Sequence, residues 1–429
     1  MEIIKQMTLG LLIIKVCSNF FCEFLSYRIS EKKYDTGVVL INRIRIFNLM
    51  AESEYDVIVI GGGIIGSSIA YHLVKANQRV VLIDADHKGK ATKAGAGIIS
   101  APTTFAENED MYSFLLNASR YYPEISKELE IQNGVKTSYE VSEEVVVANA
   151  DDQITQFNEA VKRMLSRQQR YNFPPTSELY EMEINEFSQR FPDLKIPKKA
   201  LYYSSAGKID GKEFTNAIKK VGMALGLKIL NGTVETLQFD EHNCTGVNLD
   251  NQSITATNTI IAGGAWSKSF ETQLNIKLQI YPQRGQIVHL VLKESQKEIP
   301  IIISMSDYYS LNWGPDHIIV GATREDDSGF IAKNTVKGIQ SVLRQGLEMI
   351  PALIDGEISE IRVGLRPYSK DKLPIMGKIP DKAGIWVATG HGPLGLTSAP
   401  YTGKLMADAI VESKFDPIFE KFSPERFKR

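Results

Sequence analysis

The sequence predicts an α/β fold built on a parallel sheet, and three observations carry this prediction. A short β-branched run, Asp56–Ile60, leads directly into the glycine-rich segment GGGIIG at 61–66. A helical stretch at 67–75 and a second apolar run that ends in an acid, Arg79–Asp84, follow. The same order of strand, glycine turn and helix returns at 384–412, with the helix expected over Ala399–Glu412. Strands that alternate with helices in this way form a parallel sheet that helices cover.

The first unit fits a dinucleotide site, because each residue type in it has a physical role. Gly61, Gly63 and Gly66 match G-x-G-x-x-G. The first permits a tight turn, the second lets the backbone approach a pyrophosphate, and the third lets helix and strand pack closely. The helix start offers N–H groups and a positive dipole end to phosphates.

Asp84 completes the unit, 18 residues after Gly66. It can accept hydrogen bonds from ribose hydroxyls, and an acid at this place argues against NADP. The unit is therefore of Rossmann type, but the local motif leaves FAD and NAD both open.

The composition limits the classes of function that the chain can have. A chain of 429 residues allows two or three domains. The net charge of −2 gives no sign of a nucleic-acid surface, so we expect no nucleic-acid partner. Cys17, Cys22 and Cys244 suggest neither a disulfide framework nor a zinc site. We therefore predict no metal and a reducing, cytoplasmic location.

Residues 1–49 differ from the rest. The apolar stretch Met7–Ile14 is interrupted by Lys15 and is short of the roughly 20 residues that a membrane span needs. No cationic start or small-residue cleavage site marks a signal peptide. Met50 opens MAESEYDVIVIGGG, which reads like a natural protein start. We interpret 1–49 as a non-native extension, with a targeting segment or a structural extension as alternatives.

Four motifs near the end carry a resemblance to a known family. They read GLRP at Gly364–Pro367, PIMG at Pro374–Gly377, ATGHG at Ala388–Gly392 and APYTG at Ala399–Gly403. With the first unit and weaker matches at 260–267, 282–286 and 321–325, the chain resembles the FAD-dependent D-amino-acid oxidase-like superfamily over about residues 54–412. Within it, glycine oxidases and D-amino-acid dehydrogenase small chains are the most similar.

The resemblance implies FAD, held without a covalent bond. Monomeric sarcosine oxidases hold flavin through a late cysteine, whereas no cysteine follows Cys244 here. The implied FAD contacts are Gly61, Gly63, Ile64, Ile65, Gly66, Asp84, Ala91, Thr92, Gly95, Ala96, Gly97, Ile98, Val234, Gly263, Gly264, Trp266, Gly390, His391, Gly392, Leu394, Gly395, Leu396 and Thr397. A small-residue loop at 90–99, an ordinary strand start at Val234 and a histidine satisfied by the backbone at His391 are the plain structural alternatives.

The resemblance also implies two interleaved domains. A Rossmann-type FAD-binding domain would take residues 54–135, 200–278 and 355–412. An α+β substrate domain built on an antiparallel sheet would take 136–199 and 279–354. Helical runs at 110–131 and 151–169 carry no chemistry that we can name, and we expect the charged tail after Phe415 at the surface.

Arg366 is the residue expected to hold substrate, because an arginine fork matches a carboxylate in two parallel hydrogen bonds. Relatives of the glycine-oxidase type use this arginine in that way, and a structural ion pair is the alternative. Tyr308 and Tyr309 are adjacent on an expected strand, so one faces the cavity and the other the core. Some glycine oxidases carry an arginine after the G-H segment, where this chain has Gly392–Leu394 and looks closer to the dehydrogenases.

These features predict oxidation of a small amine or amino acid of the glycine or D-amino-acid type, by hydride transfer to flavin N5. The imine product would hydrolyse to a keto acid and ammonia. Alternatives are a secondary or N-methyl amine, a hydroxy acid, a tRNA-modification factor, and a flavin-binding protein without catalysis. The sequence leaves open the oligomeric state and the electron acceptor; a quinone acceptor would imply peripheral membrane association.

Overall fold

The computed structural model describes residues 54–292, 299–314 and 316–428. They belong to one compact unit, Ser53–Arg429, so the expectation for residues 1–49 lies outside the described residues. Within this part of the chain, the helices are too short or too polar to cross a membrane.

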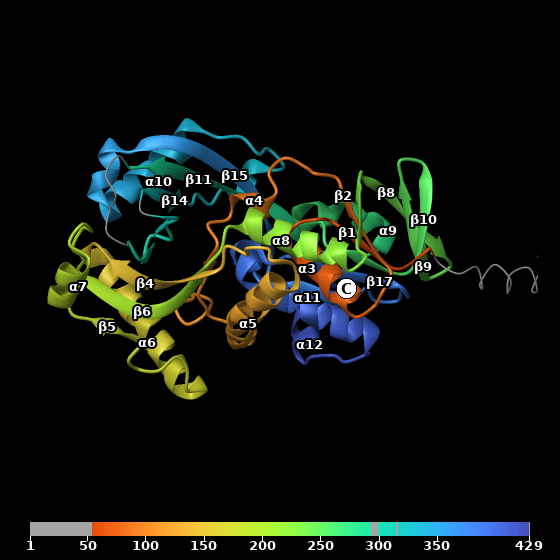
Figure 1. Cartoon of the computed structure of the whole chain (residues 1–429), viewed down its shortest axis with the longest axis horizontal. Coiled ribbons are helices and arrows are strands. Elements are labelled where there is room, and N and C mark those ends of the chain that lie inside the picture. Colours follow the sequence, from red (N-terminus) through yellow and green to blue (C-terminus); the bar gives the residue numbers. More distant parts are fainter. Residues whose placement is uncertain (1–53, 293–298, 315, 429) are drawn as a thin grey trace, which may run out of the picture. The chain divides into compact units, whose positions relative to one another are not determined.

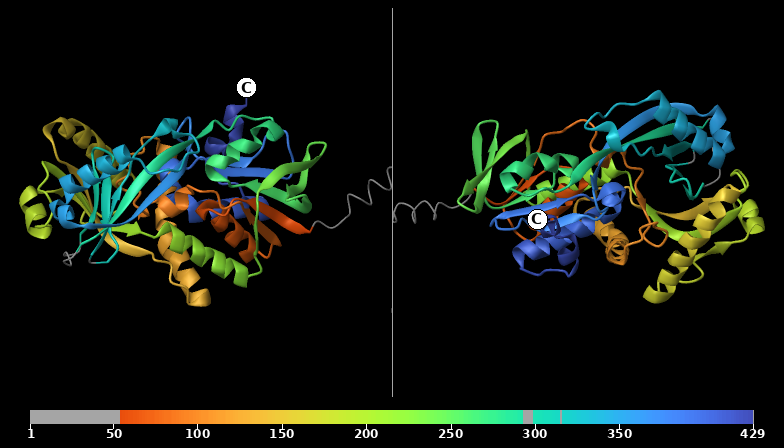
Figure 2. Two further views of the ribbon diagram at one scale, coloured as in Figure 1. Left: turned by 90° about the horizontal axis from the view of Figure 1, so that it is seen from above. Right: turned by 180° about the vertical axis from the view of Figure 1, so that it is seen from behind.

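The first sheet has eight strands, and its centre is the predicted parallel arrangement (Figure 1). β1 (Tyr55–Ile60) pairs in parallel with β2 (Val80–Asp84) on one side and β10 (Gln252–Ile261) on the other. The sheet continues through β17 (Ile385–Thr389) and β16 (Ile375–Lys378) at one end and β7 (Lys228–Asn231) at the other. β8 (Val234–Asp240) and β9 (Asn243–Leu249) form a hairpin, green in Figure 2, that joins β10.

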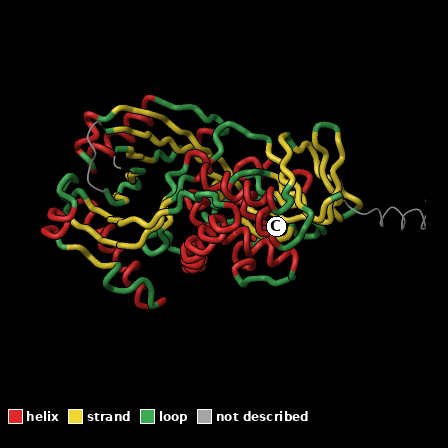
Figure 3. Tube along the Cα trace, in the orientation of Figure 1, coloured by secondary structure: helices red, strands yellow, loops and turns green. Residues whose placement is uncertain are grey.

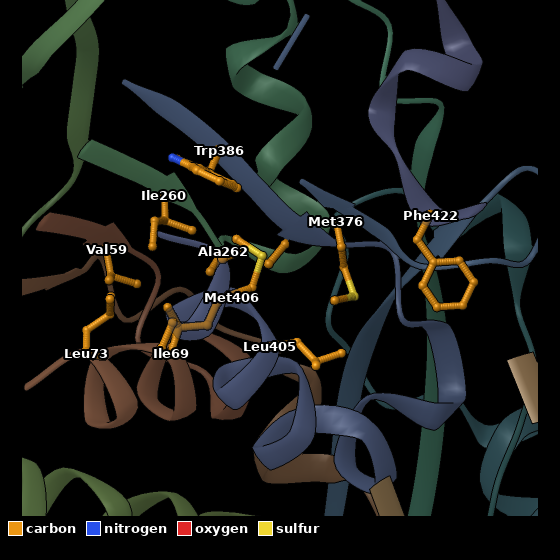
Figure 4. Packing of buried hydrophobic residues seen from close by; sticks show 14 of the residues in the cluster. Val59, Ile69, Leu73, Ile260, Ala262, Met376, Trp386, Leu405, Met406 and Phe422 are labelled. Atoms are coloured by element: carbon orange, nitrogen blue, oxygen red, sulfur yellow. The ribbon is translucent and has the colours of Figure 1, made fainter. Parts of the chain in front are cut away.

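Both faces of β1 are buried, as its unbroken apolar run predicts for a parallel strand. Val57 and Val59 pack with one cluster of apolar side chains, whereas Ile58 and Ile60 pack with another. Figure 4 shows the first cluster, in which Val59 and Ile260 of the sheet lie near Ile69, Leu73 and Met406 of the covering helices.

The helices that build this layer pack against one another and against the sheet (Figure 3). They are α3 (Ile64–Lys75), α5 (Glu109–Asn133), α8 (Gly211–Ala224) and α11 (Gly395–Val411), with the short α4 (Ala91–Ala94), α9 (Glu271–Leu274) and α12 (Ile418–Phe422). The charged residues of the tail lie at the surface or are half-buried, but the expectation was wrong for Phe419 and Phe422 of α12, which are buried in the first cluster. The sequence IFEKF places these two apolar rings three residues apart, on one face of a helix.

The second sheet has nine strands and is mostly antiparallel. Its order is β15 (Glu357–Ser369), β11 (Ile280–Val291), β14 (His317–Gly321), β13 (Tyr309–Asn312), β12 (Ile301–Ser304), β4 (Glu140–Ala148), β6 (Lys199–Lys208) and β3 (Ile98–Ile99), with β5 (Leu179–Met182) on β6. β12 and β4 depart from the expectation and run in parallel. They come from separate parts of the chain, so no hairpin fixes their relative direction.

Helices cover both faces of the second sheet. On one face, α10 (Val336–Met349) and α7 (Ile184–Arg190) pack on side chains such as Val145 and Val147. On the other face, α6 (Ile154–Tyr171) packs on Val146 and Ala148. β3, β6 and β15 join this sheet although they lie in the ranges expected for the FAD-binding domain, so the domain limits stay a proposal that these pairings refine.

Candidate active site

A cavity of about 780 Å³ lies at the carboxyl ends of β1, β2 and β10 and extends to the second sheet. Ligands bind at this end of parallel strands, and the volume is typical of a ligand site. Among the residues singled out from the sequence, Gly66 and Tyr308 are absent from its wall. Those that line it are Gly61, Gly63, Ile64, Ile65, Asp84, Ala91, Thr92, Gly95, Ala96, Gly97, Ile98, Val234, Gly263, Gly264, Trp266, Tyr309, Arg366, Gly390, His391, Gly392, Leu394, Gly395, Leu396 and Thr397.

The first glycine turn is shaped by close backbone approaches. Gly61 has φ +108°, and a Cβ there would lie 2.5 Å from the Ala262 carbonyl oxygen. A Cβ at Gly66 would lie 1.9 Å from the Gly61 carbonyl oxygen, which explains why Gly66 serves packing rather than the cavity wall. The Cβ of any residue at 63 would meet the Thr92 hydroxyl at 3.3 Å. Side chains are therefore kept out of the cavity at the start of α3.

Thr92 joins this turn to the loop after β2. Its Oγ1 accepts a hydrogen bond from the Ile64 N–H at 3.1 Å. Gly63 at the N-cap contributes no side-chain cap, so the positive end of α3 is directed at the cavity. An anion placed here would be stabilised by the helix start.

Asp84 is a buried carboxylate at the cavity wall. Lys90 Nζ lies 2.6 Å from its Oδ2, and the Asp86 N–H donates to its Oδ1 at 3.2 Å. Burial raises the pKa of Asp84, but the hydrogen bond and charge of Lys90 outweigh burial and hold it below its usual value. Sequence reasoning did not single out Lys90, although a cation six residues after the acid was a visible signal.

The second glycine turn lies at the end of β17. Gly390 and Gly392 have φ of +74° and +54°, and α11 begins at Gly395. His391 between them is buried and lines the cavity; its Nε2 lies 3.2 Å from the Thr402 hydroxyl. Its Nδ1 has no partner among the described residues, and burial lowers the pKa of His391 to about 3. The ring is therefore neutral, with one nitrogen free for another group.

Arg366 presents a guanidinium to the cavity. Its Nη1 donates to Gln283 Oε1 at 3.2 Å and to the Thr323 carbonyl at 3.0 Å. Burial lowers the pKa of Arg366, and the neighbouring charge of Arg324 acts in the same direction, yet a guanidinium stays charged. No carboxylate of the described residues forms an ion pair with it, which argues against the structural alternative.

Two tyrosines and a second arginine belong to the same part of the site as Arg366. Tyr309 lines the cavity, whereas the hydroxyl of Tyr308 lies 2.6 Å from Ser341 Oγ, away from it. Burial raises the pKa of the Tyr309 hydroxyl, so it stays protonated. Arg324 also lines the cavity and forms an ion pair of 3.2 Å with Asp307. Sequence reasoning included Arg324 in a weak motif but assigned it no role.

Val234 and Trp266 line the cavity as well. Trp266 stacks on His87, with the ring centroids 4.8 Å apart and the planes 13° from parallel. His87 follows β2 by three residues, so this stack forms the wall beside Asp84. The stacked rings of Trp266 and His87 offer a flat aromatic surface at the Asp84 end of the cavity.

The comparisons with known proteins agree with this geometry. Residues 56–409 match the family model described as "DAO: FAD dependent oxidoreductase". The chain is 29% identical over 370 residues to the "Uncharacterized oxidoreductase YurR" of Bacillus subtilis, covering 86% of this chain and 98% of that protein. It is 25% identical to the glycine oxidase of Bacillus subtilis, with coverage of 84% and 94%. The crystal structure of iminodiacetate oxidase from Chelativorans sp. BNC1 matches with a TM-score of 0.80 and 30% identity, over 86% of this chain and 98% of that one.

Proposed function

The chain belongs to the DAO family of FAD-dependent oxidoreductases, and we propose that it oxidises a small amino acid of the glycine or D-amino-acid type, held by its carboxylate. The observation that carries the proposal is Arg366, a half-buried cation without a carboxylate partner in the described structure, at the wall of the cavity. A desolvated guanidinium is stabilised by an anionic ligand, and its fork suits a carboxylate.

The cavity residues fit FAD at its other end. Gly61, Gly62, Gly63, Gly390 and Gly392 present backbone rather than side chains to the cavity wall, and each of the two turns precedes a helix start. Asp84 offers carboxylate oxygens for hydroxyl groups, and Thr92 and the start of α3 suit phosphates. His391 Nδ1 is a buried polar atom that still lacks a partner. These residues would hold the cofactor.

The chain's own part in the reaction is to orient and enclose the substrate. When bound, FAD would accept a hydride from the substrate carbon, and the resulting imine would hydrolyse to a keto acid and ammonia. Arg366 fixes the carboxylate, which sets the position of the neighbouring carbon. Tyr309 stays protonated and offers a hydroxyl to the same ligand.

A second candidate substrate is a secondary amine that carries two carboxylates. Arg324 favours it, because this second cation lines the same cavity and its charge is felt by Arg366. The structural relative named iminodiacetate oxidase supports the same idea. In this candidate, Arg366 holds one carboxylate and Arg324 the other.

An anaerobic test separates these substrates. The FAD-loaded enzyme is mixed without oxygen with glycine, D-alanine, sarcosine, iminodiacetate, methylamine and glycolate, and flavin absorbance is followed. We expect bleaching by acids that carry an amine and little by methylamine or glycolate. Bleaching by glycolate alone would replace the proposal with a hydroxy-acid oxidase, and bleaching by none would remove it.

The electron acceptor is then assigned with the same substrate. Hydrogen peroxide formed in air indicates an oxidase, whereas turnover that requires a quinone indicates a dehydrogenase at the membrane surface. The cytoplasmic location rests on the composition argument and stays part of the proposal.

A further inference from the structure

Glu144 is a carboxyl buried inside the second sheet. It lies on β4 with 0% of its surface exposed, next to the apolar run Val145–Val147. Its Oε1 accepts a hydrogen bond from the Thr103 hydroxyl, while its Oε2 has no partner in the described part of the chain. An unpaired buried carboxyl is destabilising, so its presence calls for a reason other than stability.

The neighbouring glutamate shows the contrast. Glu143 is partly exposed and pairs with Arg190 and with the Tyr202 hydroxyl, on the opposite face of the strand. The pairing of β4 with β6 shifts register between Ser142 and Glu144, as at a β-bulge. The extra residue of this irregularity lies on β6, so the alternation of side chains along β4 is unbroken and directs one glutamate outward and the other inward.

Two hydroxyls connect Glu144 with the active-site cavity. Thr103 Oγ1 lies 2.7 Å from Ser100 Oγ, and both residues line the cavity. The tight turn that brings them together has the Thr104 N–H donating to the Ala101 carbonyl at 3.1 Å, with Pro102 inside it. Since Thr103 donates to Glu144, it must accept from Ser100, which leaves lone pairs of the Ser100 oxygen to accept from the cavity. Both O–H groups therefore point toward the carboxyl.

We propose that Glu144 receives, through Thr103 and Ser100, the proton that the substrate ammonium loses before it is oxidised. The proposal rests on the proposed function, since an amino acid enters as an ammonium ion. An N–H bond of the ammonium breaks and an O–H bond forms at Ser100. Ser100 passes its own proton to Thr103, Thr103 passes its own to Glu144, and the free amine remains. Hydride loss from the free amine leaves an iminium ion, which with water gives the keto acid and ammonium, so Glu144 releases its proton by the same route to water in the cavity once the product has left.

The surroundings of Glu144 suit this exchange. Burial raises the pKa of Glu144 to about 7, although the hydroxyls of Thr103 and Ser100 act to lower it. From β6, Tyr203 lies opposite Glu144, and the pKa of its hydroxyl is raised by burial and by Glu144. Neither β12 (IIIS) nor the turn at 100–104 (SAPTT) brings an ionisable side chain. A carboxyl that titrates near neutral pH both accepts and releases a proton.

Four variants test the relay in the FAD-loaded enzyme. Glu144→Gln keeps the shape and removes the acceptor, Thr103→Val breaks the chain of hydroxyls, and Thr103→Ser keeps it. Glu143→Gln is the matched control on the opposite face. The measurements are kcat/KM and the anaerobic rate of flavin reduction across pH.

In the wild type we expect the rate to rise with pH through about 7 and then to level off. Glu144→Gln and Thr103→Val should lower the rate at least about tenfold near pH 7 and recover at high pH, where the substrate is already a free amine. The double variant that combines Glu144→Gln with Thr103→Val should be no slower than either single variant, because both changes interrupt the same relay. Thr103→Ser and Glu143→Gln should follow the wild type.

Superimposable profiles of the wild type and Glu144→Gln would overturn the relay. If Glu144→Gln fails to fold, the relay would be overturned by equal pH profiles of Thr103→Val and Thr103→Ser. Infrared spectra supply a readout without substrate, because the carboxyl band that titrates in the wild type should be missing in Glu144→Gln and present in Glu143→Gln. A wild-type flavin that no amine bleaches refutes the proposed function, whereas normal bleaching with an unchanged Glu144→Gln profile refutes the relay alone.

Discussion

The guanidinium of Arg366 on β15 lies beside Gly285 on the neighbouring strand β11, in the space that a side chain at 285 would occupy. A Cβ at Gly285 would come within 2.6 Å of Arg366 Nη2. The absence of a side chain at 285 therefore fixes where the cation can lie in the cavity wall.

Gly285→Ala should displace Arg366 while the cofactor end is untouched. Overpacking of this kind costs about 1–3 kcal/mol, which is roughly a 5- to 200-fold loss if it falls on substrate binding. We expect kcat/KM for amino acids to fall within that range, with FAD content unchanged. An equal fall for an amine without a carboxylate would mean that the substitution acts through general damage.

Arg366→Ala should leave FAD bound and impair turnover of amino acids. Removing one partner of a desolvated charge pair costs about 2–5 kcal/mol, or roughly 30- to 4,000-fold in kcat/KM. Arg366→Lys should rescue only in part, since a point charge does not reproduce the fork. The decisive comparison uses one substrate with a carboxylate and one without. If both lose the same factor, Arg366 has a structural role and the substrate class is reopened.

Arg324→Gln tests whether Arg324 binds a second carboxylate of the substrate. We expect kcat/KM for iminodiacetate to fall about tenfold or more, while that for glycine or sarcosine changes little, because only the diacid reaches the second cation. Asp307→Asn is the control that breaks the same ion pair of 3.2 Å but keeps the cation. Equal losses for mono- and diacids would remove the candidate substrate that is a secondary amine with two carboxylates.

FAD should be released when the protein is precipitated with acid. Cys244 is buried, and no cysteine lies later in the sequence, so a late thioether to flavin is absent. The supernatant should contain free FAD and the pellet should be colourless. Colour that stays with the pellet would show a covalent link to another residue.

Glu144→Gln should stabilise the protein at high pH more than at low pH. The folded pKa of about 7 lies above the usual 4.5, so the stability that Glu144 contributes is fully present below about 4.5 and is lost as pH rises toward about 7. Glutamine removes this loss, and the gain above pH 7 is on the order of 3 kcal/mol at most. Unfolding midpoints at about pH 5 and pH 8 measure it. Glu143→Gln should show no such gain.

The sequence was sufficient for the parts of the fold in which local pattern and tertiary structure agree. The expected strand Asp56–Ile60 is β1, Tyr55–Ile60, and the expected helix Ser67–Lys75 lies within α3. Helix α11 begins four residues earlier than its expected start at Ala399. Pro400 obscured that start, because it cannot donate to the Leu396 carbonyl. The Tyr122 hydroxyl donates to this carbonyl instead, a contact over 274 residues that no local pattern reveals.

The candidate site is divided in the same way, between residues that local sequence patterns predict and residues that only the tertiary structure reveals. Glycines, Asp84 and Arg366 stand in recognisable motifs, so their place in one cavity could be expected. The burial of Glu144 could not be expected, because two adjacent glutamates look alike in sequence and only the packing around β4 shows which of them faces the buried side. Lys90 lies close enough in sequence for its pairing with Asp84 to be foreseen, whereas Arg324 is an ordinary surface cation by sequence and only the packing of the second sheet makes it a neighbour of the cavity.

The order of strands in the first sheet has a consequence for biosynthesis. β1 leaves the ribosome first but lies between β2 and β10, and the last part of the cofactor cradle, at the start of α11, is made near the end of the chain. The interval between β1 and β10 is about 190 residues, or roughly 10–40 s of translation. The edge of β1 that pairs with β10 therefore stays without its partner strand through nearly half of synthesis. We therefore expect a nascent chain stalled before Gly395 to retain FAD poorly, because the part of the cavity wall at the start of α11 is not yet made.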